Sequence, residues 1–240
     1  MEFIINRDIF LKSIGHASGI VEKKTTLPIL SNILIEAKNS KIKITATDLD
    51  IIYSEEIAVK SLIKEGTTTT SASILYDILR KLESNSDVKL SLQSSNKLNL
   101  MSGNSKFNLL CLSADNFPLS DEDIKQKPFE VPSQKLLNLL NKTKISISND
   151  ETRHYLNGIY LHKMNLENKS FLYGIATDSH RLSSSRLEID QNTDFEKIIL
   201  PKKTIFQLIS LIEQSTNNIK ISNNKSKIKF EIDSGILISK

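Results

Sequence analysis

The sequence predicts an α+β protein made of two tandem copies of one unit, each with two helices packed on antiparallel sheets. Many short segments alternate apolar and polar residues, which is the pattern of half-buried strands. Four other segments place apolar residues at helical spacing. The same order of segments recurs after about 127 residues. Each copy contains too many strands to be one repeat of a solenoid, so we expect each to form a domain with its own core.

Each copy opens with a short apolar strand followed by a helix. The first strand is Phe3-Ile4-Ile5, and Asn6 or Asp8 can cap the helix after it. The second copy opens with Phe129-Glu130-Val131, and Pro132-Ser133 then starts the helix. The apolar faces of these helices comprise Phe10, Ile14 and Ala17 in the first copy and Leu136, Leu137 and Leu140 in the second.

A strand pair ending in the tripeptide Ala-Thr-Asp comes next in both copies. In the first, the strand that begins at Leu30 leads through a Lys/Asn turn to Ala46-Thr47-Asp48. In the second, the strand that begins at Leu156 leads to Ala176-Thr177-Asp178. The leading Leu and the Thr are 17 residues apart in the first copy and 21 in the second. We expect a longer hairpin loop, Lys163 to Lys169, to account for the difference.

Each copy then runs through strand-like segments to a second helix and closes with three alternating strands. The polar run from Ser120 to Asp123 indicates a linker, so we expect domains at residues 1–122 and 128–240. The second helices are marked by Ile74, Leu75, Ile78, Leu79 and Leu82 and by Ile205, Leu208, Ile209 and Ile212. The closing strands are marked by Val88, Leu90, Leu92, Leu98, Leu100, Phe107 and Leu109 and by Ile219, Ile221, Ile228, Phe230, Ile236 and Ile238.

The composition is that of a soluble globular protein, with 240 residues of which 39% are hydrophobic and 25% charged. No apolar run approaches the roughly 18 residues that a membrane helix needs. The N-terminus lacks the basic-then-apolar layout of a signal peptide. The single cysteine, Cys111, excludes an intramolecular disulfide and fits a reducing compartment. We therefore expect a cytoplasmic protein without membrane contact, with Cys111 in a core strand.

The positive charge lies in the second copy. The net charge is +4; residues 1–125 carry 15 Lys and Arg against 16 Asp and Glu, and residues 126–240 carry 17 against 12. Basic side chains on helices that share one face of each domain could form a surface for phosphates, or simply a solvated helix face. The basic residues on or beside the predicted helices are Lys12, Arg80, Lys81, Lys135, Lys142, Lys202 and Lys203.

The residues that could carry catalysis do not form a recognised arrangement. Asp178, Ser179 and His180 are adjacent, and adjacent side chains on an extended strand alternate faces, so they cannot form a relay there. A hydrolase that uses Ser179 and His180 therefore needs those side chains to converge. Asp48 and Asp178 occupy equivalent positions in separate domains. We expect each to accept hydrogen bonds in the turn after its strand, in preference to acting as a catalytic pair.

Metal and cofactor motifs are absent from the sequence as well. No histidine has another histidine two to four residues away, and the lone cysteine offers no CxxC pair. The few glycines give no phosphate-binding loop. We expect no metal and no cofactor. The histidines are His16, His154, His162 and His180.

Five segments together resemble the bacterial sliding clamp family, the beta subunit of DNA polymerase III. The first copy contributes Thr26 to Leu34 and Ala46-Thr47-Asp48-Leu49. The second contributes Arg153 to Gly158 and Ala176 to Leu182, and Asp115 to Pro118 lies near the seam. The resemblance covers the whole chain and implies two tandem DNA-clamp domains.

The resemblance implies a processivity factor with no catalytic activity. Clamps of this family close head to tail into a ring homodimer that encircles double-stranded DNA, and they tether the replicative polymerase so that rebinding is effectively intramolecular. The resemblance places Lys24, His154 and Tyr155 at DNA-contacting positions, with Arg153 adjacent. Two further contact positions carry Ser73 and Asp150, where the family type has Arg and Gln. Both positions therefore depart from the family pattern. At Asp150 a carboxylate would face phosphate, which is unfavourable.

The resemblance also implies an outer pocket for a short apolar peptide motif. Partners that carry the motif include the DNA polymerase III catalytic subunit, the clamp loader and other clamp-binding proteins. Ser179 stands where the family type has Gly, so we expect it to narrow the pocket or to restrict the backbone. The matching pocket residues are Leu156, Thr177, Ser179, His180, Arg181 and Leu182.

The chain ends after two repeats, whereas the family continues with a third domain that supplies the other pocket wall and one side of the subunit interface. We therefore expect a sliding clamp that lacks its third domain, is unable to close the usual ring and has a half-built pocket. The alternative is a protein-interaction adaptor derived from a clamp that does not encircle DNA. Retention on circular DNA would separate the two hypotheses.

Overall fold

The computed structural model describes residues 1–22, 26–94, 96–119, 124–150 and 152–240. The chain divides into two compact units, Met1–Asp121 and Glu122–Lys240. The predicted linker at Ser120 to Asp123 lies outside the described residues. The structure confirms the predicted α+β class, since each unit combines antiparallel sheets with a pair of α-helices.

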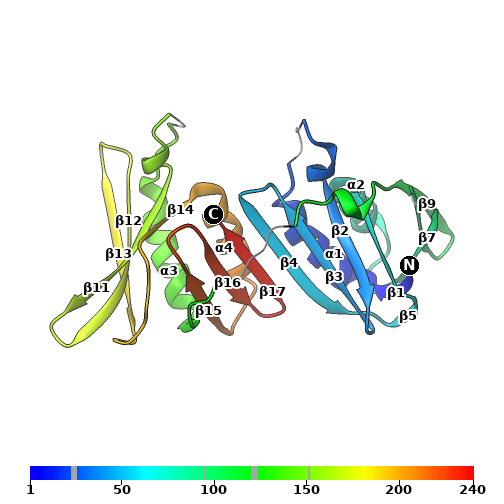
Figure 1. Ribbon diagram of the computed structural model, residues 1–240. Helices are drawn as coiled ribbons and strands as arrows, with labels where there is room; N and C mark the ends of the chain where they lie inside the picture. The colour runs from blue at the N-terminus through cyan, green and yellow to red at the C-terminus, as the bar shows by residue number, and fades with distance from the viewer. Residues whose placement is uncertain (23–25, 95, 120–123, 151) are drawn as a thin grey trace. The chain divides into compact units, whose positions relative to one another are not determined.

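Unit 1 contains two antiparallel sheets and two helices that lie side by side, α1 (Arg7–Ser18) and α2 (Ala72–Lys81) (Figure 1). One sheet has the order β5-β1-β7-β8-β9 and the other contains β4-β3-β2-β6. Two short 3₁₀ helices are η1 (Pro28–Ser31) and η2 (Ala114–Asn116). The strands are β1 (Glu2–Asn6), β2 (Asn32–Lys38), β3 (Lys41–Thr47), β4 (Ile51–Ala58), β5 (Ser61–Lys64), β6 (Gly66–Ser71), β7 (Asp87–Ser94), β8 (Lys97–Ser102) and β9 (Ser105–Leu110).

Unit 2 repeats this plan around helices α3 (Ser133–Thr143) and α4 (Lys202–Ile212). One sheet has the order β13-β12-β11-β14, and the other contains β10-β15-β16-β17. Two 3₁₀ helices, η3 (Lys144–Ser146) and η4 (His154–Leu156), follow α3. The strands are β10 (Phe129–Pro132), β11 (Gly158–Leu166), β12 (Lys169–Thr177), β13 (Leu182–Ile189), β14 (Ile198–Pro201), β15 (Asn218–Asn223), β16 (Ile228–Ile232) and β17 (Gly235–Ser239).

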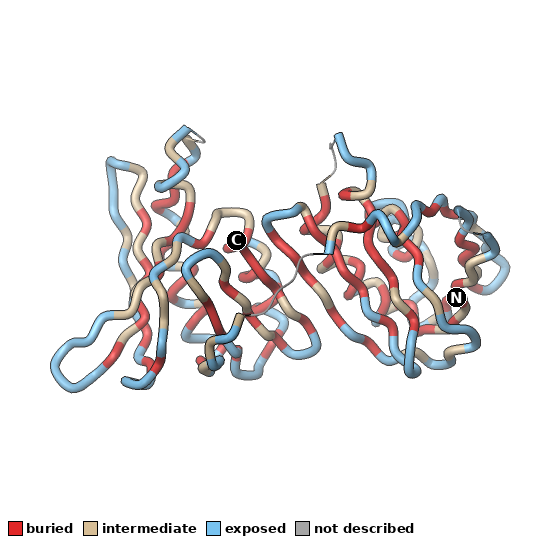
Figure 2. The backbone as a smooth tube through the Cα atoms, viewed as in Figure 1, coloured by how far each residue is buried: buried red, intermediate tan, exposed pale blue. Residues whose placement is uncertain are grey.

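The cores form where the helices meet the sheets, and buried and exposed residues alternate along many strands (Figure 2). In unit 2, a Cβ added at Gly174 would lie 2.6 Å from Leu139 Cδ2, so glycine lets α3 approach β12 closely. Most apolar positions of the predicted helices are buried, but Ile74 is 53% exposed, and Ile78, Leu82 and Leu137 are half-buried. Leu137 is predicted on one face with Leu136 and Leu140, whereas the helix turns it partly away from the sheet.

Two other predictions about local structure are wrong. The β2–β3 and β11–β12 hairpins both end in two-residue turns, at Asn39-Ser40 and Glu167-Asn168. The four additional residues in the second copy therefore lengthen both strands and do not enlarge the loop. Cys111 is buried but follows the end of β9, because that strand stops at Leu110.

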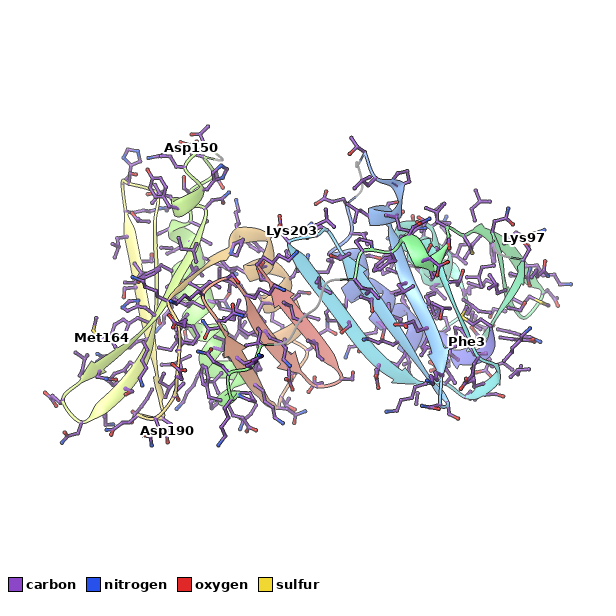
Figure 3. The ribbon with its side chains drawn as sticks, viewed as in Figure 1. Phe3, Lys97, Asp150, Met164, Asp190 and Lys203 are labelled. Carbon is purple, nitrogen blue, oxygen red and sulfur yellow. The ribbon has the colours of Figure 1, made fainter. Side chains whose placement is uncertain are left out.

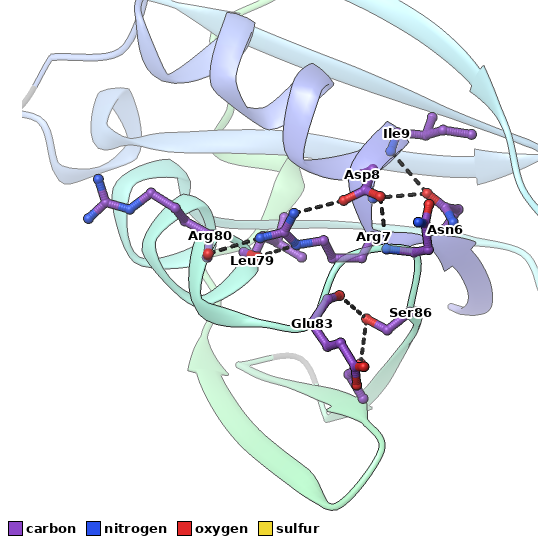
Figure 4. Close-up of polar contacts among 10 residues, drawn as sticks. Asn6, Arg7, Asp8, Ile9, Leu79, Arg80, Glu83 and Ser86 are labelled. Carbon is purple, nitrogen blue, oxygen red and sulfur yellow. Dashed lines mark hydrogen bonds and ion pairs between the residues drawn. The ribbon is translucent and has the colours of Figure 1, made fainter.

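Arg7 joins the two helices of unit 1 (Figure 4). Its Nε donates to the Leu79 carbonyl at 2.6 Å and its Nη2 to the Arg80 carbonyl at 2.9 Å, both in the last turn of α2. Its Nη1 pairs with Asp8 at 2.7 Å. Carbonyls at a helix C-terminus have no partner within the helix, so a buried guanidinium is a favourable cap. In unit 2 the first residue of α3, Ser133, reaches the Ser215 carbonyl at 3.5 Å.

Candidate nucleic-acid and peptide interface

A short turn closes the hairpin between β3 and β4 in unit 1. Thr47 Oγ1 donates to the Ile51 carbonyl at 2.9 Å and accepts from the Leu49 amide at 3.0 Å. Asp48 Oδ1 accepts from the amides of Asp50 and Ile51 at 3.1 and 2.7 Å. Asp48 is therefore a structural part of the turn, as predicted, because its carboxylate replaces backbone acceptors.

The hairpin between β12 and β13 in unit 2 closes with the same hydrogen bonds. Thr177 Oγ1 donates to the Arg181 carbonyl at 2.7 Å and accepts from the Ser179 amide at 3.2 Å. Asp178 Oδ1 accepts from the amides of His180 and Arg181 at 3.1 and 3.0 Å. Hydrogen bonds from the Arg181 and His180 amides lower the pKa of Asp178. The turn thus fixes the backbone of four predicted pocket residues.

Both turns require an unusual backbone conformation at their third residue. Leu49 has φ 84° and Ser179 has φ 79°. In the four-residue turns 48–51 and 178–181, Leu49 and Ser179 are the first of the two central residues. A positive φ at this place matches the type II′ hairpin turn, in which Gly is preferred. Ser179 therefore adopts the conformation that the family's Gly would allow without strain.

The described residues that precede β11, 148–150 and 152–157, form the loop around Asp150. Asp150 Oδ1 accepts from the amide and hydroxyl of Thr152 at 3.0 and 2.6 Å, and Oδ2 accepts from Arg153 Nε at 2.8 Å. Hydrogen bonds from the Thr152 hydroxyl and amide and from Arg153 lower the pKa of Asp150. The Ser148 amide donates to the Leu156 carbonyl at 3.0 Å, which closes the loop around η4.

Arg153 connects this loop to the turn after β12. Its Nη1 donates to Ser179 Oγ at 2.8 Å while its Nε holds Asp150. Asp178 Oδ2 pairs with Arg181 Nε at 3.0 Å. The hydroxyl and carboxylate that a Ser-His-Asp relay would use are therefore bound to other groups, which argues against a hydrolase.

Five of the six predicted pocket residues lie on the β12–β13 hairpin, and Arg153 links that hairpin to the loop that carries His154, Tyr155 and Leu156. His154 and Tyr155 are exposed on η4, with Tyr155 at 67%, and Leu156 is half-buried at its end. Leu182, at the start of β13, is 66% exposed. Figure 3 shows Asp150 at one end of unit 2 and Met164 toward the other, on the β11–β12 hairpin. Lys24 lies outside the described residues, and Ser73 is exposed on α2.

The helices of unit 2 carry a basic face. Lys135 and Lys142 are exposed on α3, Lys144 follows it on η3, and Lys202 and Lys203 begin α4. Within the described helices α3 and α4 there is no Asp or Glu. The α2 helix of unit 1 differs, because its Arg80 pairs with Asp77 at 3.4 Å.

Sequence reasoning missed two features of this region. Lys202 Nζ donates to Asn149 Oδ1, which ties the start of α4 to the loop around Asp150. Lys144 lies over the Phe206 ring, 5.8 Å from its centroid. Both pairs join residues far apart in the chain, so no local pattern signals them. The Asp150-x-Thr152 spacing, by contrast, is a local signal for an Asx-type loop.

Both units match models of one protein family. Residues 1–121 match the N-terminal domain model of the DNA polymerase III beta subunit, and residues 130–240 match its central domain. The chain belongs to this family. It is 35% identical to the beta sliding clamp of Caulobacter vibrioides and 34% identical to that of Buchnera aphidicola. It spans 65% and 62% of the length of these two relatives, and the alignments cover 100% and 97% of the chain.

Solved structures of the family share the fold of the whole chain. A Caulobacter crescentus beta sliding clamp with bound PEG superposes with a TM-score of 0.96 at 35% identity. A clamp from Bartonella birtlesii bound to griselimycin superposes with a TM-score of 0.94 at 36% identity. In both cases the match covers 100% of this chain and 64% of the other. No helix in the described part of the chain is long and apolar enough to cross a membrane.

Proposed function

We propose that this chain is part of a DNA sliding clamp, a non-catalytic processivity factor that encircles duplex DNA and tethers the replicative polymerase. The observation that carries the proposal is the match of both units to successive beta-subunit domains. The basic face of α3 and α4 supports it, since phosphate binding needs clustered cations. DNA contacts of this kind are independent of sequence and permit sliding.

The contacts assigned to DNA are Lys24, His154 and Tyr155, with Arg153 adjacent. The exposed ring of Tyr155 and the five lysines of the basic face would meet the phosphate backbone. A half-buried Leu156 and an exposed Leu182 would bind apolar side chains of a partner peptide. Partners of this kind are the polymerase catalytic subunit and the clamp loader. The full set assigned to the peptide is Leu156, Thr177, Ser179, His180, Arg181 and Leu182.

Ring closure needs a subunit contact, and β9 offers a surface for it. This strand is last in its sheet, and Leu110 at its end is 83% exposed. A groove of about 470 Å³ beside it is lined by Pro28, Ile74 and Leu112 among others. An exposed apolar edge strand has unpaired backbone groups that readily bind another chain, so it is normally covered. We assign this edge to the partner subunit of the ring.

A salt titration with linear duplex DNA tests the DNA contacts. We expect weak binding of unrelated sequences, with affinity that falls steeply as salt rises. Substituting Lys135→Gln or Lys142→Gln should lower the slope of log K against log salt by about 0.9 each. The control is Lys220→Gln, which makes the same charge change on the exposed side of β15 and should leave the slope unchanged. Tight, salt-insensitive or sequence-specific binding would contradict the proposal.

Retention on circular DNA tests encirclement with the full-length gene product. After loading by a clamp loader, a clamp should stay on a closed circle and leave once the circle is cut. Equal loss from closed and cut circles would contradict encirclement and favour an adaptor that binds proteins only.

A further inference from the structure

The Arg153 side chain forms hydrogen bonds with both the loop around Asp150 and the turn after β12. Its Nε holds Asp150 at 2.8 Å and its Nη1 holds Ser179 Oγ at 2.8 Å. The two partners are 29 residues apart in the chain. We call Asp150, Arg153 and Ser179 the bridge. It connects the segment assigned to DNA with the turn assigned to the partner peptide.

Both ends of the bridge are held firmly. Asp150 is fixed by two hydrogen bonds from Thr152, and its own amide donates to Ser148 Oγ at 3.1 Å. Ser179 is fixed by the turn, where its amide donates to Thr177 Oγ1. The planar fork of the guanidinium joins two anchored groups through two nitrogens. Water reaches the bridge, since the side chains of Arg153 and Asp150 are 37% and 39% exposed, so the bridge can open. The loop and the turn are therefore linked only while it is closed.

The hydroxyl of Ser179 is specific to the turn of unit 2. The equivalent position in unit 1 is Leu49, which has the same φ but a side chain that cannot accept a hydrogen bond. Glycine at position 179 would keep the turn and remove the acceptor. The turn alone thus does not require Ser179, although the bridge does.

We propose that the bridge couples the two binding sites, so that DNA bound at His154 and Tyr155 raises the affinity of the pocket for its peptide, and the reverse. This inference rests on the proposed function. A ligand bound at either site orders the loop and the turn together. The second ligand then binds more tightly, because the conformational free energy of that ordering is not lost a second time. Thermodynamic linkage requires the two enhancements to be equal. Arg153 acts here as a positioning residue.

The experiment measures the affinity of the protein for griselimycin, the ligand in the Bartonella structure, with and without a saturating 30-base-pair duplex of arbitrary sequence. Weaker griselimycin binding in Leu182→Ala, without the duplex, assigns this ligand to the pocket. We expect the duplex to raise griselimycin affinity about fivefold, which is the lower end of typical coupling between sites. Ser179→Ala and Ser179→Gly both remove the hydroxyl, and should reduce the enhancement to less than about twofold. Arg153→Gln should do the same from the other end of the bridge.

The matched control is Leu49→Ala, which changes the equivalent turn position in unit 1 and should leave the enhancement unchanged. Amide hydrogen exchange of residues 153–157 in the free protein gives a readout that needs no ligand. It should become faster in Ser179→Ala and stay unchanged in Leu49→Ala.

Two results would overturn the inference while leaving the proposed function intact. One is binding of both ligands without any mutual enhancement. The other is an enhancement that persists in Ser179→Ala, Ser179→Gly and Arg153→Gln. Failure of the unsubstituted protein to bind duplex DNA even at low salt would overturn the proposed function itself, and the inference with it.

Discussion

The turn at Thr47–Ile51 and the turn at Thr177–Arg181 have the same hydrogen bonds and a similar φ at their third residue. Their other side chains differ. Unit 1 has Leu49 and Asp50, whereas unit 2 has Ser179, His180 and Arg181 at the exposed positions. The Thr and Asp that recur in both units therefore stabilise the backbone of the turn. The residues that vary are those available for binding, and only in unit 2 does one of them meet Arg153.

The anchor between helices shows the largest expected difference between the units. Arg7 is 8% exposed and caps two carbonyls of α2, while Ser133 makes one long hydrogen bond of 3.5 Å. Arg7→Ala should lower the free energy of unfolding by about 3 kcal/mol, because buried acceptors lose their partners. Ser133→Ala should cost about 0.5 kcal/mol. Urea unfolding at a constant m-value measures both.

Arg7→Met keeps the packing of the side-chain stem and removes the donors, so it should reproduce most of the Arg7→Ala loss. A loss in Arg7→Met as small as that in Ser133→Ala would show that Arg7 acts by packing alone.

The two turn threonines should differ next. Thr47 is 1% exposed and Thr177 is half-buried, although their hydroxyls make the same two hydrogen bonds. Thr47→Val should cost about 2 kcal/mol, since two hydrogen bonds of a buried hydroxyl are lost at about 1 kcal/mol each. Thr177→Val should cost about 0.5 kcal/mol, because water can replace the hydroxyl. Equal losses in urea unfolding would mean that burial does not distinguish the two turns.

The smallest expected effect concerns the positive φ that the turns share. At both Leu49 and Ser179, the Gly variant should be more stable than the Ala variant by about 1 kcal/mol, because only Ala keeps a Cβ in the left-handed region. The thermal midpoints of Leu49→Gly, Leu49→Ala, Ser179→Gly and Ser179→Ala measure this difference. A Gly preference at one position only would show that the two backbones are not equivalent.

The repeat and the element order could be predicted from the sequence because apolar periodicity is a local signal. Of the two cap candidates, Asn6 and Asp8, the cap is Asn6, and its side chain accepts from the amides of Asp8 and Ile9. The length of the β11–β12 hairpin was misread because Met164 and Leu166 are exposed, so the polar and apolar residues near its tip do not show where pairing ends.

The candidate site could be predicted as a set of residues but not as a network. The motif Ala176 to Leu182 is contiguous, so its turn could be inferred from Asp178 alone. The Arg153–Ser179 hydrogen bond joins residues 26 positions apart. No spacing rule covers such a pair, since it depends on how the loop around Asp150 folds back onto the sheet.

The register of the first strands has a consequence for how the chain folds during synthesis. In β1, Glu2 pairs with Ser91 of β7, and in β10, Pro132 pairs with Asn218 of β15. Each unit therefore begins with a strand that must wait for a partner made much later, while the β2–β3 and β11–β12 hairpins can form at once. On the ribosome, unit 1 can close its first sheet only after β7 has emerged, and unit 2 repeats the delay. Before β7 emerges β1 can pair only with β5, and among the described strands β10 pairs with β15 alone.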